Sequence, residues 1–447
     1  MGSYELALNN GKLFFNNSFI DANIAVLDGR IAEIKKVEIQ DAEQIIDCKG
    51  KLILPGIIDA HVHFRVPGNE KKEDWVSGSK AALHGGVTTV LDMPNNNPAI
   101  TTADLLEQKR KLVEKDSLIN YGFHFGVSNG NSRELKNARN IASFKLYLGS
   151  TTGNLLVNDD SALEKCFEIA SLKSKMIAVH AEDEKIILQN AKKFQNESNA
   201  KVHNKIRTVE AELEAIKKAI SFAKQFKTRL HICHVSSKES LFLIQEAKKS
   251  GLHISCEATP TYLFFDESDV GKKGCLLKVN PSIKTEKDRK ALWFGLNTSQ
   301  FDIIATDHAP HLLEEKQQDY WKVPSGIPGI ETSLSLMLDA SEKRLIQLEK
   351  VIKLMTENPA ALFKIKNKGK IEKGYDADLV VVDLKKEFVV KNDELFSKSA
   401  WTPFEGLKLK GKVEKTLVKG SLLFDNGDII INKNKESKAN LEVGYYG

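Results

Sequence analysis

Strand-like and helix-like segments alternate through the middle of this 447-residue chain, and no other feature constrains its fold as strongly. Short apolar runs are followed by longer stretches with helical periodicity, such as EAELEAIKKAISFAKQF at 210–226. Eight β-then-α units in about 310 residues are the sequence form of a (β/α)8 TIM barrel, an α/β fold. The predicted strands span residues 57–63, 87–93, 119–127, 143–148, 176–181, 229–235, 252–258 and 302–307.

Both ends of the chain predict short strands instead of helices. YELALNNGKLFF and ANIAVLDGRIAEI near the start, and ADLVVVDL, FVVKND and KVEKTLVKGSLLF near the end, are separated by Gly, Asp and Asn. The Asn-Gly and Asp-Gly pairs are hairpin-turn signals. We therefore expect a small β-sandwich domain built from residues 1–54 and 365–447, and a catalytic barrel over residues 55–364.

The stretch AHVHFR at 60–65 places two histidines at alternate positions of the first predicted barrel strand. Side chains alternate faces along a strand, so His61 and His63 should point to the same side. Two imidazoles on one face can bind one metal ion. This pair alone does not separate a metal site from two histidines held by hydrogen bonds.

Further potential ligands recur where other predicted strands end. In a (β/α)8 barrel the active site lies at the carboxyl ends of the strands, so these side chains should meet at one rim. Together they predict a metal site there. The residues are Lys145, His180, His231, His234, Asp307, His308 and His311.

Lys145 is the unusual member of this set, because an ammonium repels metal cations. Burial lowers the pKa of a lysine, and the neutral amine that results is a nucleophile. Such an amine can add carbon dioxide and become an anionic carbamate, whose two oxygens can bridge two cations. The alternatives for Lys145 are a solvent-facing lysine at the strand end and a lysine paired with an acid.

Composition and charge argue against several other classes of protein. The net charge is +5, from 65 basic and 60 acidic residues, and the lysine-rich segment at 364–374 lacks interleaved aromatic residues. This is typical of a solvated surface, not of a nucleic-acid site. No apolar run approaches membrane-spanning length, and no secretory signal is expected. Five scattered cysteines favour reduced thiols in the cytoplasm over disulfides or a cysteine zinc site.

Five segments together resemble the amidohydrolase superfamily, and within it the dihydroorotase family: PGIIDAHVHFRVPG, FKLYLGSTTGN, AVHAED, HICHVSS and ATDHAPH. GYDADLVVVD and WTPFEGLKLKGKV resemble the closing strands of that family, so the resemblance extends across nearly the whole chain. It implies a metal-dependent cyclic amidohydrolase. The implied reaction is the reversible cyclisation of N-carbamoyl-L-aspartate to L-dihydroorotate in de novo pyrimidine biosynthesis.

The resemblance also implies two zinc ions per chain, bridged by a carboxylated Lys145 and a hydroxide. Asp307 would be both a ligand and the catalytic proton acceptor. His231, three residues before His234, is expected to be a core residue on the opposite face of its strand. The implied ligands are His61, His63 and Asp307 for one zinc, His180 and His234 for the other, and Lys145 for both.

The same resemblance implies contacts to a small anionic substrate. Asn95 has an alternative role as a turn residue in MPNNNP, whereas an arginine beside two metal ligands should meet an anion. Neither nucleic acid nor a membrane is expected as a partner, and the oligomeric state is left open, with a homodimer as one option. The implied contacts are Arg65 and Asn95 to the substrate carboxylate, Asn280 and His311 to the ring and its carboxylate, and Ser325 and Gly326 to the ring.

Two segments depart from the family pattern. NPSIK at 280–284 replaces the commoner NPPLR, so Lys284 stands where an arginine is usual, and ATPTYLFF at 258–265 lacks paired histidines often found there. Both concern the substrate pocket, and the second keeps an allantoinase or a hydantoinase as an alternative. A catalytically silent homologue that acts as an assembly partner is a further alternative. Loss of metal ligands would mark such a protein, and every implied ligand is present.

Overall fold

The computed structural model describes residues 3–431 and 441–446, whose strands form three hydrogen-bonded sheets. Two of these sheets are parallel. The first has the order β6 (Ile57–Val62), β7 (Val87–Asp92) and β8 (Asn120–Phe123). The second contains β9 (Phe125–Gly126), β10 (Phe144–Tyr147), β11 (Ile177–His180), β12 (Leu230–Ile232), β13 (Ile254–Ala258) and β14 (Ile303–Ile304), again in chain order.

All the strands predicted for the middle of the chain are present, each shorter than its predicted run. The predicted strand 119–127 is divided at His124 into β8 and β9. The two parallel sheets contact each other at both edges. Val62 forms a parallel bridge with His308, and at the opposite edges the Ala142 N–H donates to the Phe123 carbonyl over 2.8 Å. The middle of the chain is therefore an α/β structure with two adjoining parallel sheets.

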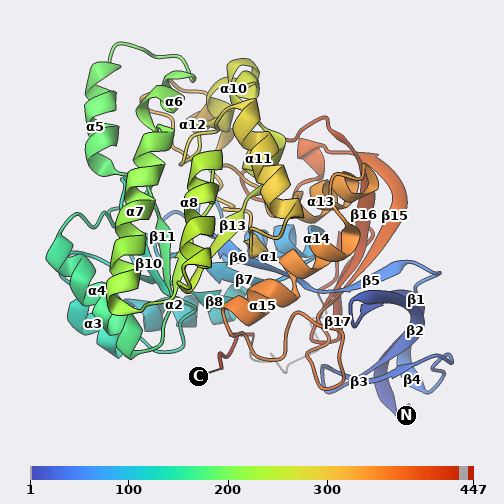
Figure 1. Cartoon of the computed structure of the whole chain (residues 1–447). Helices are drawn as coiled ribbons and strands as arrows, with labels where there is room; N and C mark the ends of the chain where they lie inside the picture. The colour runs from blue at the N-terminus through green and yellow to red at the C-terminus, as the bar shows by residue number, and fades with distance from the viewer. Residues whose placement is uncertain (1–2, 432–440, 447) are drawn as a thin grey trace.

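Helices follow most of the parallel strands and lie outside them (Figure 1). They are α1 (Trp75–His84), α2 (Ala103–Asp116), α3 (Ser132–Asn137), α4 (Asp160–Leu172), α5 (Glu184–Lys193), α6 (Val202–Ile206), α7 (Val209–Phe226), α8 (Lys238–Lys249), α9 (Pro260–Phe264), α10 (Glu267–Lys273), α11 (Glu286–Asn297), α12 (Leu313–Lys316), α13 (Ser333–Glu342), α14 (Leu348–Met355) and α15 (Glu357–Leu362), with 3-10 turns η1 (Gly274–Leu277) and η2 (Asn392–Glu394).

Helix α7 illustrates why these segments are helical. Its N-cap Thr208 accepts a hydrogen bond from the Ala211 N–H, which satisfies one of the free amides of the first turn. Ala215, Ile216 and Ala219 recur at helical spacing and are buried. The predicted helix 210–226 is confirmed to within one residue.

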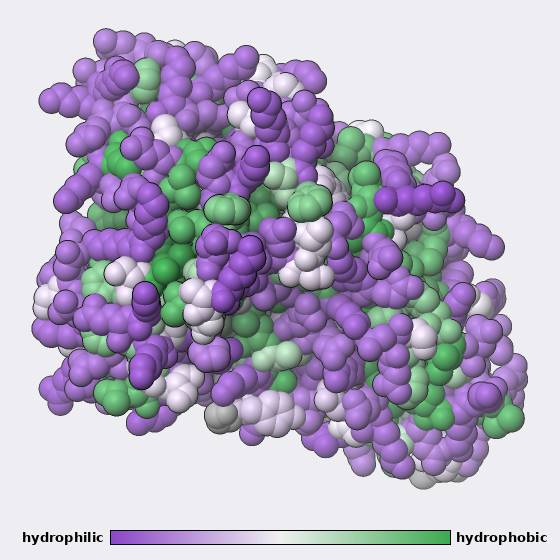
Figure 2. Space-filling view, in the orientation of Figure 1, coloured by the Kyte–Doolittle hydropathy of each residue, from purple (hydrophilic) through white to green (hydrophobic). Residues whose placement is uncertain are grey.

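The largest apolar cluster joins the parallel strands to the helices around them, for example Val179 of β11 to Ile216 of α7. Burying an aliphatic side chain of this size contributes about 1.5–3 kcal/mol. Figure 2 shows hydrophilic residues over most of the viewed face, with apolar residues visible between them. The amphipathic helices thus hold the strand ends in fixed positions.

The third sheet has nine strands and combines both ends of the chain. β5 (Leu52–Pro55) pairs in parallel with β1 and antiparallel with β15, so the predicted association of the two ends is confirmed. The sandwich form and the domain limits stay predictions. The other strands are β1 (Tyr4–Phe15), β2 (Ser18–Leu27), β3 (Arg30–Lys35), β4 (Ala42–Asp47), β15 (Leu379–Val389), β16 (Lys408–Val418), β17 (Ser421–Asp425) and β18 (Asp428–Ile429).

Two local predictions for this sheet are wrong. Asn10-Gly11 does not form a hairpin but lies at an irregularity inside β1, where a Cβ on Gly11 would lie 2.2 Å from Ile53 Cδ1. Asp28-Gly29, by contrast, does connect β2 to β3. ADLVVVDL and FVVKND, predicted as separate strands, contribute to the single strand β15.

Residues 441–446 lie outside the nine-stranded sheet and run along β8. The Tyr121 N–H donates to the Leu441 carbonyl over 3.0 Å, and the Val443 N–H donates to the Tyr121 carbonyl over 2.8 Å. Val443 packs in a cluster with Ile58 and Ile303 of the parallel strands. The predicted β domain over 365–447 thus includes a segment that packs on the parallel sheets, and residues 432–440 lie outside the described part.

All five cysteines are free thiols, as expected, and four of them are buried. No helix in the described part of the chain has both the length and the apolar content that crossing a membrane requires.

Candidate active site

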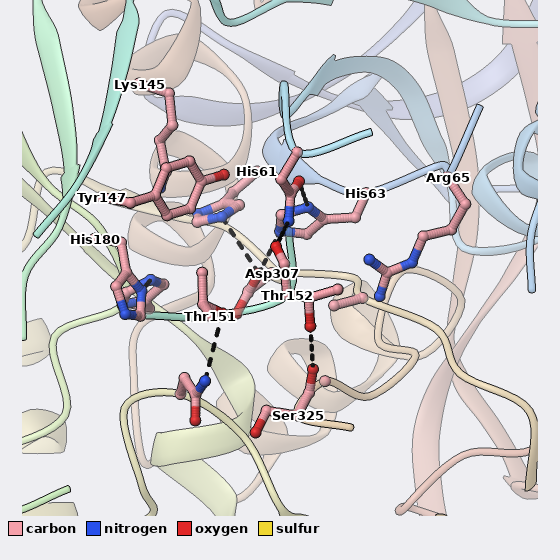
Figure 3. Close-up of a pocket in the computed structure, with 15 residues that line it drawn as sticks. His61, His63, Arg65, Lys145, Tyr147, Thr151, Thr152, His180, Asp307 and Ser325 are labelled. Carbon is pink, nitrogen blue, oxygen red and sulfur yellow. Dashed lines mark hydrogen bonds and ion pairs between the residues drawn. The ribbon is translucent and has the colours of Figure 1, made fainter. Parts of the chain in front are cut away.

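A cavity opens where the carboxyl ends of the parallel strands meet, and every implied metal ligand and substrate contact except His311 lines it (Figure 3). His231 and His308, the other histidines at the predicted strand ends, do not line it. The lining consists of His61, His63, Arg65, Asn95, Lys145, Tyr147, Thr151, Thr152, His180, His234, Asn280, Asp307, Ala309, Ser325 and Gly326.

His61, His63 and Asp307 form one group in this cavity. Asp307 Oδ1 lies 3.3 Å from His61 Nε2 and 3.0 Å from His63 Nε2. His61 and His63 do point to the same side, as alternation along a strand predicts. Burial disfavours the charge of Asp307, but the neighbouring histidines hold the pKa of its carboxyl well below the usual range.

The opposite ring nitrogen of each histidine is held by a protein oxygen. His61 Nδ1 lies 2.6 Å from Glu257 Oε1, and His63 Nδ1 lies 2.6 Å from Asn95 Oδ1. Both oxygens accept, so each Nδ1 carries a hydrogen and Nε2 is the ring nitrogen that faces Asp307. Burial lowers the pKa of His63 to about 4, whereas at His61 the effect of burial is outweighed by the Glu257 carboxylate, which raises the pKa to about 10.

His180 and His234 form the second group. His180, the last residue of β11, has its Nδ1 3.0 Å from His234 Nε2. Its Nε2 lies 3.1 Å from Glu182 Oε2. His234 lies two residues beyond the end of β12 and has a positive φ of 35°. Both rings are buried, and burial lowers the pKa of each, so both are neutral at pH 7.

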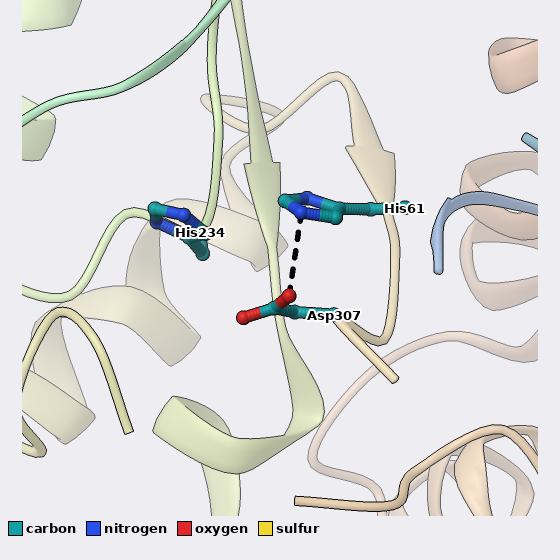
Figure 4. Close-up of side chains that lie close together, drawn as sticks. All are labelled: His61, His234 and Asp307. Carbon is teal, nitrogen blue, oxygen red and sulfur yellow. Dashed lines mark ion pairs between the residues drawn. The ribbon is translucent and has the colours of Figure 1, made fainter. Parts of the chain in front are cut away.

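The donor set fits divalent metal ions. His61, His234 and Asp307 each offer a ligand atom within 4.8 Å of those of the other two (Figure 4). His234 Nδ1 is buried without a hydrogen-bond partner in the described residues. Imidazole nitrogens and carboxylate oxygens are common zinc ligands, and a cation would satisfy the lone pairs that converge here.

Lys145 is completely buried in the wall of this cavity. Its Nζ donates to Cys233 Sγ over 3.0 Å and lies 5.2 Å from the centre of the Tyr147 ring. Within the described ranges, no carboxylate oxygen lies within 4.0 Å of it. The two alternatives, a solvent-facing lysine and one paired with an acid, are therefore wrong.

Arg65 brings a second buried cation to the cavity, with 4% of its surface exposed. Its Nε–H donates to the Pro310 carbonyl over 3.1 Å. Burial lowers the pKa of Arg65 to about 10, which still leaves the guanidinium charged at neutral pH. In residues 3–431 and 441–446 no carboxylate oxygen lies within 4.0 Å of it, so its charge is available to an anion.

His311 lies behind the cavity wall and does not line it, unlike the other predicted substrate contacts. Lys72 Nζ donates to His311 Nδ1 over 2.9 Å, so the ring hydrogen is on Nε2. That Nε2–H donates to the Ser325 carbonyl over 3.1 Å. His311 therefore holds the loop that carries Ser325, and it lies beside Arg65, at 3.2 Å from Nη2.

The remaining predicted contacts already have protein partners. Asn95 orients His63 and donates from Nδ2 to the Thr152 carbonyl over 2.8 Å. Asn280 Oδ1 lies 3.1 Å from His203 Nε2. Both side chains line the cavity, and their contact with a substrate stays a prediction.

Sequence reasoning missed four lining residues, one of them Ala309, and one buried carboxylate. Tyr147 lies two residues after Lys145 on β10, so strand alternation could have identified it. Thr151 and Thr152 follow on the next loop, which gave no separate signal. The carboxylate is Glu257 at the end of β13, which contacts His61 from below the cavity.

The core position predicted for His231 is correct, but the face is not. Its Nε2 lies 3.0 Å from Glu257 Oε2, and the same carboxylate contacts His61. His231 thus points toward the same interior as the cavity residues. Strand alternation fails here because β12 ends at Ile232, before His234.

Both departures from the family pattern lie behind the cavity wall. Lys284 Nζ donates to the Arg207 carbonyl over 2.7 Å and to Ser282 Oγ over 2.8 Å. The Tyr262 hydroxyl donates to the Pro281 carbonyl over 2.7 Å. Neither Lys284 nor Tyr262 lines the cavity, and both contact the residues that directly follow Asn280.

The sequence pattern of the amidohydrolase family matches residues 52–423. A protein named dihydroorotase from Methanosphaera stadtmanae is 36% identical over 431 residues, which cover 95% of this chain and 97% of that protein. Another protein of that name, from Pyrococcus abyssi, is 38% identical over 421 residues, which cover 94% of this chain and 95% of that protein.

Solved structures of cyclic amidohydrolases have the same fold. The L-hydantoinase (dihydropyrimidinase) from Arthrobacter aurescens superposes with a TM-score of 0.92 at 28% identity, over 96% of this chain and 98% of that one. The dihydropyrimidinase from Brevibacillus agri NCHU1002 gives a TM-score of 0.89 at 26% identity, over 95% and 96% of the two chains. With matches to the family pattern, to full-length relatives and to these structures, the chain belongs to the amidohydrolase family.

Proposed function

We propose that this chain is a dihydroorotase, a metal-dependent enzyme that interconverts N-carbamoyl-L-aspartate and L-dihydroorotate in pyrimidine biosynthesis. We also propose that its two parallel sheets close into one (β/α)8 barrel, with the nine-stranded sheet as a β-sandwich beside it. The full-length relatives named dihydroorotase support the reaction. The contacts at both edges of the two sheets support the barrel.

The observation that carries the substrate assignment is the buried Arg65 guanidinium, which lines the cavity without a carboxylate partner in the described residues. An unpaired buried charge costs several kcal/mol, so an arginine in this state suits a bound anion. Dihydroorotate has a carboxylate on its ring. Hydantoin, unsubstituted dihydropyrimidines and allantoin have no such group, so Arg65 favours dihydroorotate over the alternative substrates.

The proposed cofactor is a pair of Zn²⁺ ions. His61, His63 and Asp307 would hold one, and His180 and His234 the other, with a carbamate on Lys145 as the common ligand. The carbamate reverses the charge of a lysine that has no acidic partner within 4.0 Å among the described residues.

Metal ions held by these ligands would activate a water and polarise the carbonyl of the ring amide. Arg65 binds the substrate carboxylate and so fixes the ring over Asp307. Asp307 accepts a proton from the attacking water and returns it to the ring nitrogen as the C–N bond breaks. In the reverse direction the same group removes a proton from the ureido nitrogen, and the ring closes with loss of water.

Two divalent metal ions per chain are expected in the purified protein, because five ligand side chains and Lys145 surround one cavity. Elemental analysis of protein prepared without chelator measures this directly. No more than a trace of metal would contradict the proposed site.

Arg65→Ala is expected to lower kcat/KM for dihydroorotate far more than it lowers metal content. Losing a buried charge-assisted contact costs about 2–5 kcal/mol, or roughly 30- to 5,000-fold. Arg289→Ala is the control, because Arg289 pairs with Asp266 and lies outside the cavity. An unchanged kcat/KM in Arg65→Ala would remove this residue from the substrate site.

A hydantoinase or an allantoinase is the second candidate, because the solved structures with high similarity are hydantoinases and dihydropyrimidinases. Turnover of dihydroorotate, hydantoin and allantoin, measured side by side, separates these functions. A silent homologue that acts as an assembly partner would turn over none of the three.

We further propose a cytoplasmic location. Five free cysteines favour a reducing cytoplasm, and the balanced charge gives no reason to expect a nucleic acid or a membrane as partner. Sedimentation of the purified protein tests whether the chain forms a homodimer.

A further inference from the structure

Glu257 is a buried carboxylate beneath the cavity that contacts both proposed metal-ligand groups. It lies near the end of β13, with 1% of its surface exposed, and it does not line the cavity. Each of its oxygens accepts hydrogen bonds from histidine residues: Oε1 from His61 and His234, and Oε2 from His231.

The contact with His61 fixes which ring nitrogen faces the cavity. His61 Nδ1–H donates to Oε1 over 2.6 Å, so Nε2 is the ring nitrogen that faces the cavity, 3.3 Å from Asp307 Oδ1. Without an acceptor below it, the ring could rotate or change tautomer. A carboxylate that receives the second N–H of a ligating histidine commonly raises its ligand strength.

The contact with His234 acts on the main chain. The His234 N–H donates to the same Oε1 over 2.9 Å. His234 adopts a φ of 35°, in the left-handed region, which costs a non-glycine residue about 1–3 kcal/mol unless its surroundings enforce it. Holding this amide turns the His234 side chain toward His180, whose Nδ1 lies 3.0 Å from His234 Nε2.

The third contact fixes the carboxylate itself. His231 Nε2–H donates to Oε2 over 3.0 Å, and Ser255 Oγ lies 2.9 Å from His231 Nδ1. Glu257 therefore cannot rotate without breaking contacts on both of its oxygens. A residue that looked like ordinary core, His231, thus belongs to the support of the cavity.

We propose that Glu257 is a positioning residue that couples the two metal positions: one carboxylate orients His61, a ligand of the first ion, and His234, a ligand of the second. The inference rests on the proposed metal site and adds to it. Its consequence is that a change at Glu257 weakens both ions together, although Glu257 touches neither the substrate nor the reacting atoms.

The chain offers a matched control in Glu212. This carboxylate is equally buried and accepts hydrogen bonds from the Ser236 N–H over 2.9 Å and from the Ser237 hydroxyl over 2.7 Å. It holds the segment that follows His234, but no histidine contact to it is recorded in the described residues. Glu212→Gln and Glu212→Ala therefore reproduce the loss of a buried carboxylate without loss of histidine orientation.

The test is a titration of metal-free protein with Zn²⁺, and with Co²⁺ to follow the absorption spectrum of the ligand field. Glu257→Gln keeps the shape and one acceptor oxygen, whereas Glu257→Ala removes both oxygens. We expect Glu257→Gln to weaken both ions on the order of 10–100-fold and to change the Co²⁺ spectrum, with a larger effect in Glu257→Ala. Both Glu212 variants should bind two ions as the wild type does.

Several results would overturn the proposal. One is normal affinity for both ions in Glu257→Gln, and another is a loss confined to one ion. A third is a lower melting temperature of the metal-free protein with unchanged metal affinities, which would make Glu257 merely structural. If Glu257→Ala does not fold, Glu257→Gln alone decides. Failure of the wild type to bind two ions would instead contradict the proposed function.

Discussion

Asp307→Asn is expected to lower kcat for dihydroorotate on the order of 10²–10⁴-fold. Asp307 Oδ1 lies 3.0 Å from His63 Nε2 and 3.3 Å from His61 Nε2, at the centre of the proposed site. A carboxylate there can take a proton from water and return it to the ring nitrogen. An amide can do neither at neutral pH, even if its oxygen still reaches a metal ion. Initial rates at saturating dihydroorotate measure the effect.

Metal content must be measured on the same sample, because Asp307 is also a proposed ligand. Lost turnover with two ions retained would assign the effect to proton transfer. Asp302→Asn is the control, since Asp302 accepts from the Cys256 N–H over 2.7 Å and lies outside the cavity. Activity of Asp307→Asn within tenfold of the wild type would show that another group is the base.

The residues that sequence reasoning placed correctly lie on or directly after strands. His61, Lys145 and His180 lie on β6, β10 and β11, whose carboxyl ends meet at the cavity. A period of two then fixes their face. The family resemblance supplied their roles, and the geometry supports those roles without testing them.

The positions that the sequence did not reveal depend on contacts between segments far apart in the sequence. His311 is held behind the cavity lining between Lys72, more than two hundred residues earlier, and the Ser325 carbonyl. Glu257 gave no signal, since a glutamate at a strand end usually faces solvent, and only the fold brings His61, His231 and His234 around it. Spacing along one strand cannot report such contacts.

The hairpin predicted in the nine-stranded sheet is absent for the same reason, a contact between distant segments. Asn10-Gly11 has hairpin chemistry, and Asn10 does adopt a positive φ of 56°. The chain nevertheless continues as β1, because Gly11 allows Ile53 of β5 to pack against the backbone at that point. The Asn-Gly pair correctly indicated the positive φ of Asn10. Contact with β5 is the reason that the chain continues as a strand there and does not turn.

Two fully buried lysines show why Lys145 is expected to be modified. Lys109 Nζ lies 2.5 Å from Asp92 Oδ2 and 2.8 Å from Asn96 Oδ1, so its charge is neutralised and solvated by protein. Lys145 has a thiol as its recorded hydrogen-bond partner, and within the described residues no carboxylate lies within 4.0 Å. A permanent ammonium there, facing two dications, would be strongly disfavoured. A carbamate reverses the charge and supplies one oxygen to each ion.

The Lys145→Ala variant is therefore expected to lose part of its metal and nearly all of its turnover. The loss of turnover should be well beyond the roughly 10–100-fold that follows removal of a residue that contacts only a metal ligand. The deleted side chain leaves a slot that a small carboxylate such as acetate or propionate can enter, and partial recovery of kcat with added acid is the expected signature. Recovery will be incomplete, because a free acid lacks the advantage of a tethered group. Lys109→Met, which breaks a buried ion pair outside the cavity, should lower stability and should not respond to acetate.

The most direct measurement is a high-resolution map of the wild-type side chain. If Lys145 is the common ligand, density must continue past Nζ into a planar group with two oxygens, one toward each ion. The alternative is a bare amine, which could remain near two dications only if it were deprotonated and bound one of them as a neutral donor. A neutral amine has a single lone pair, so Lys145 could not then bind both metal ions. Density that ends at Nζ with two metal ions bound close by would therefore contradict the carbamate, whatever the turnover of the variant.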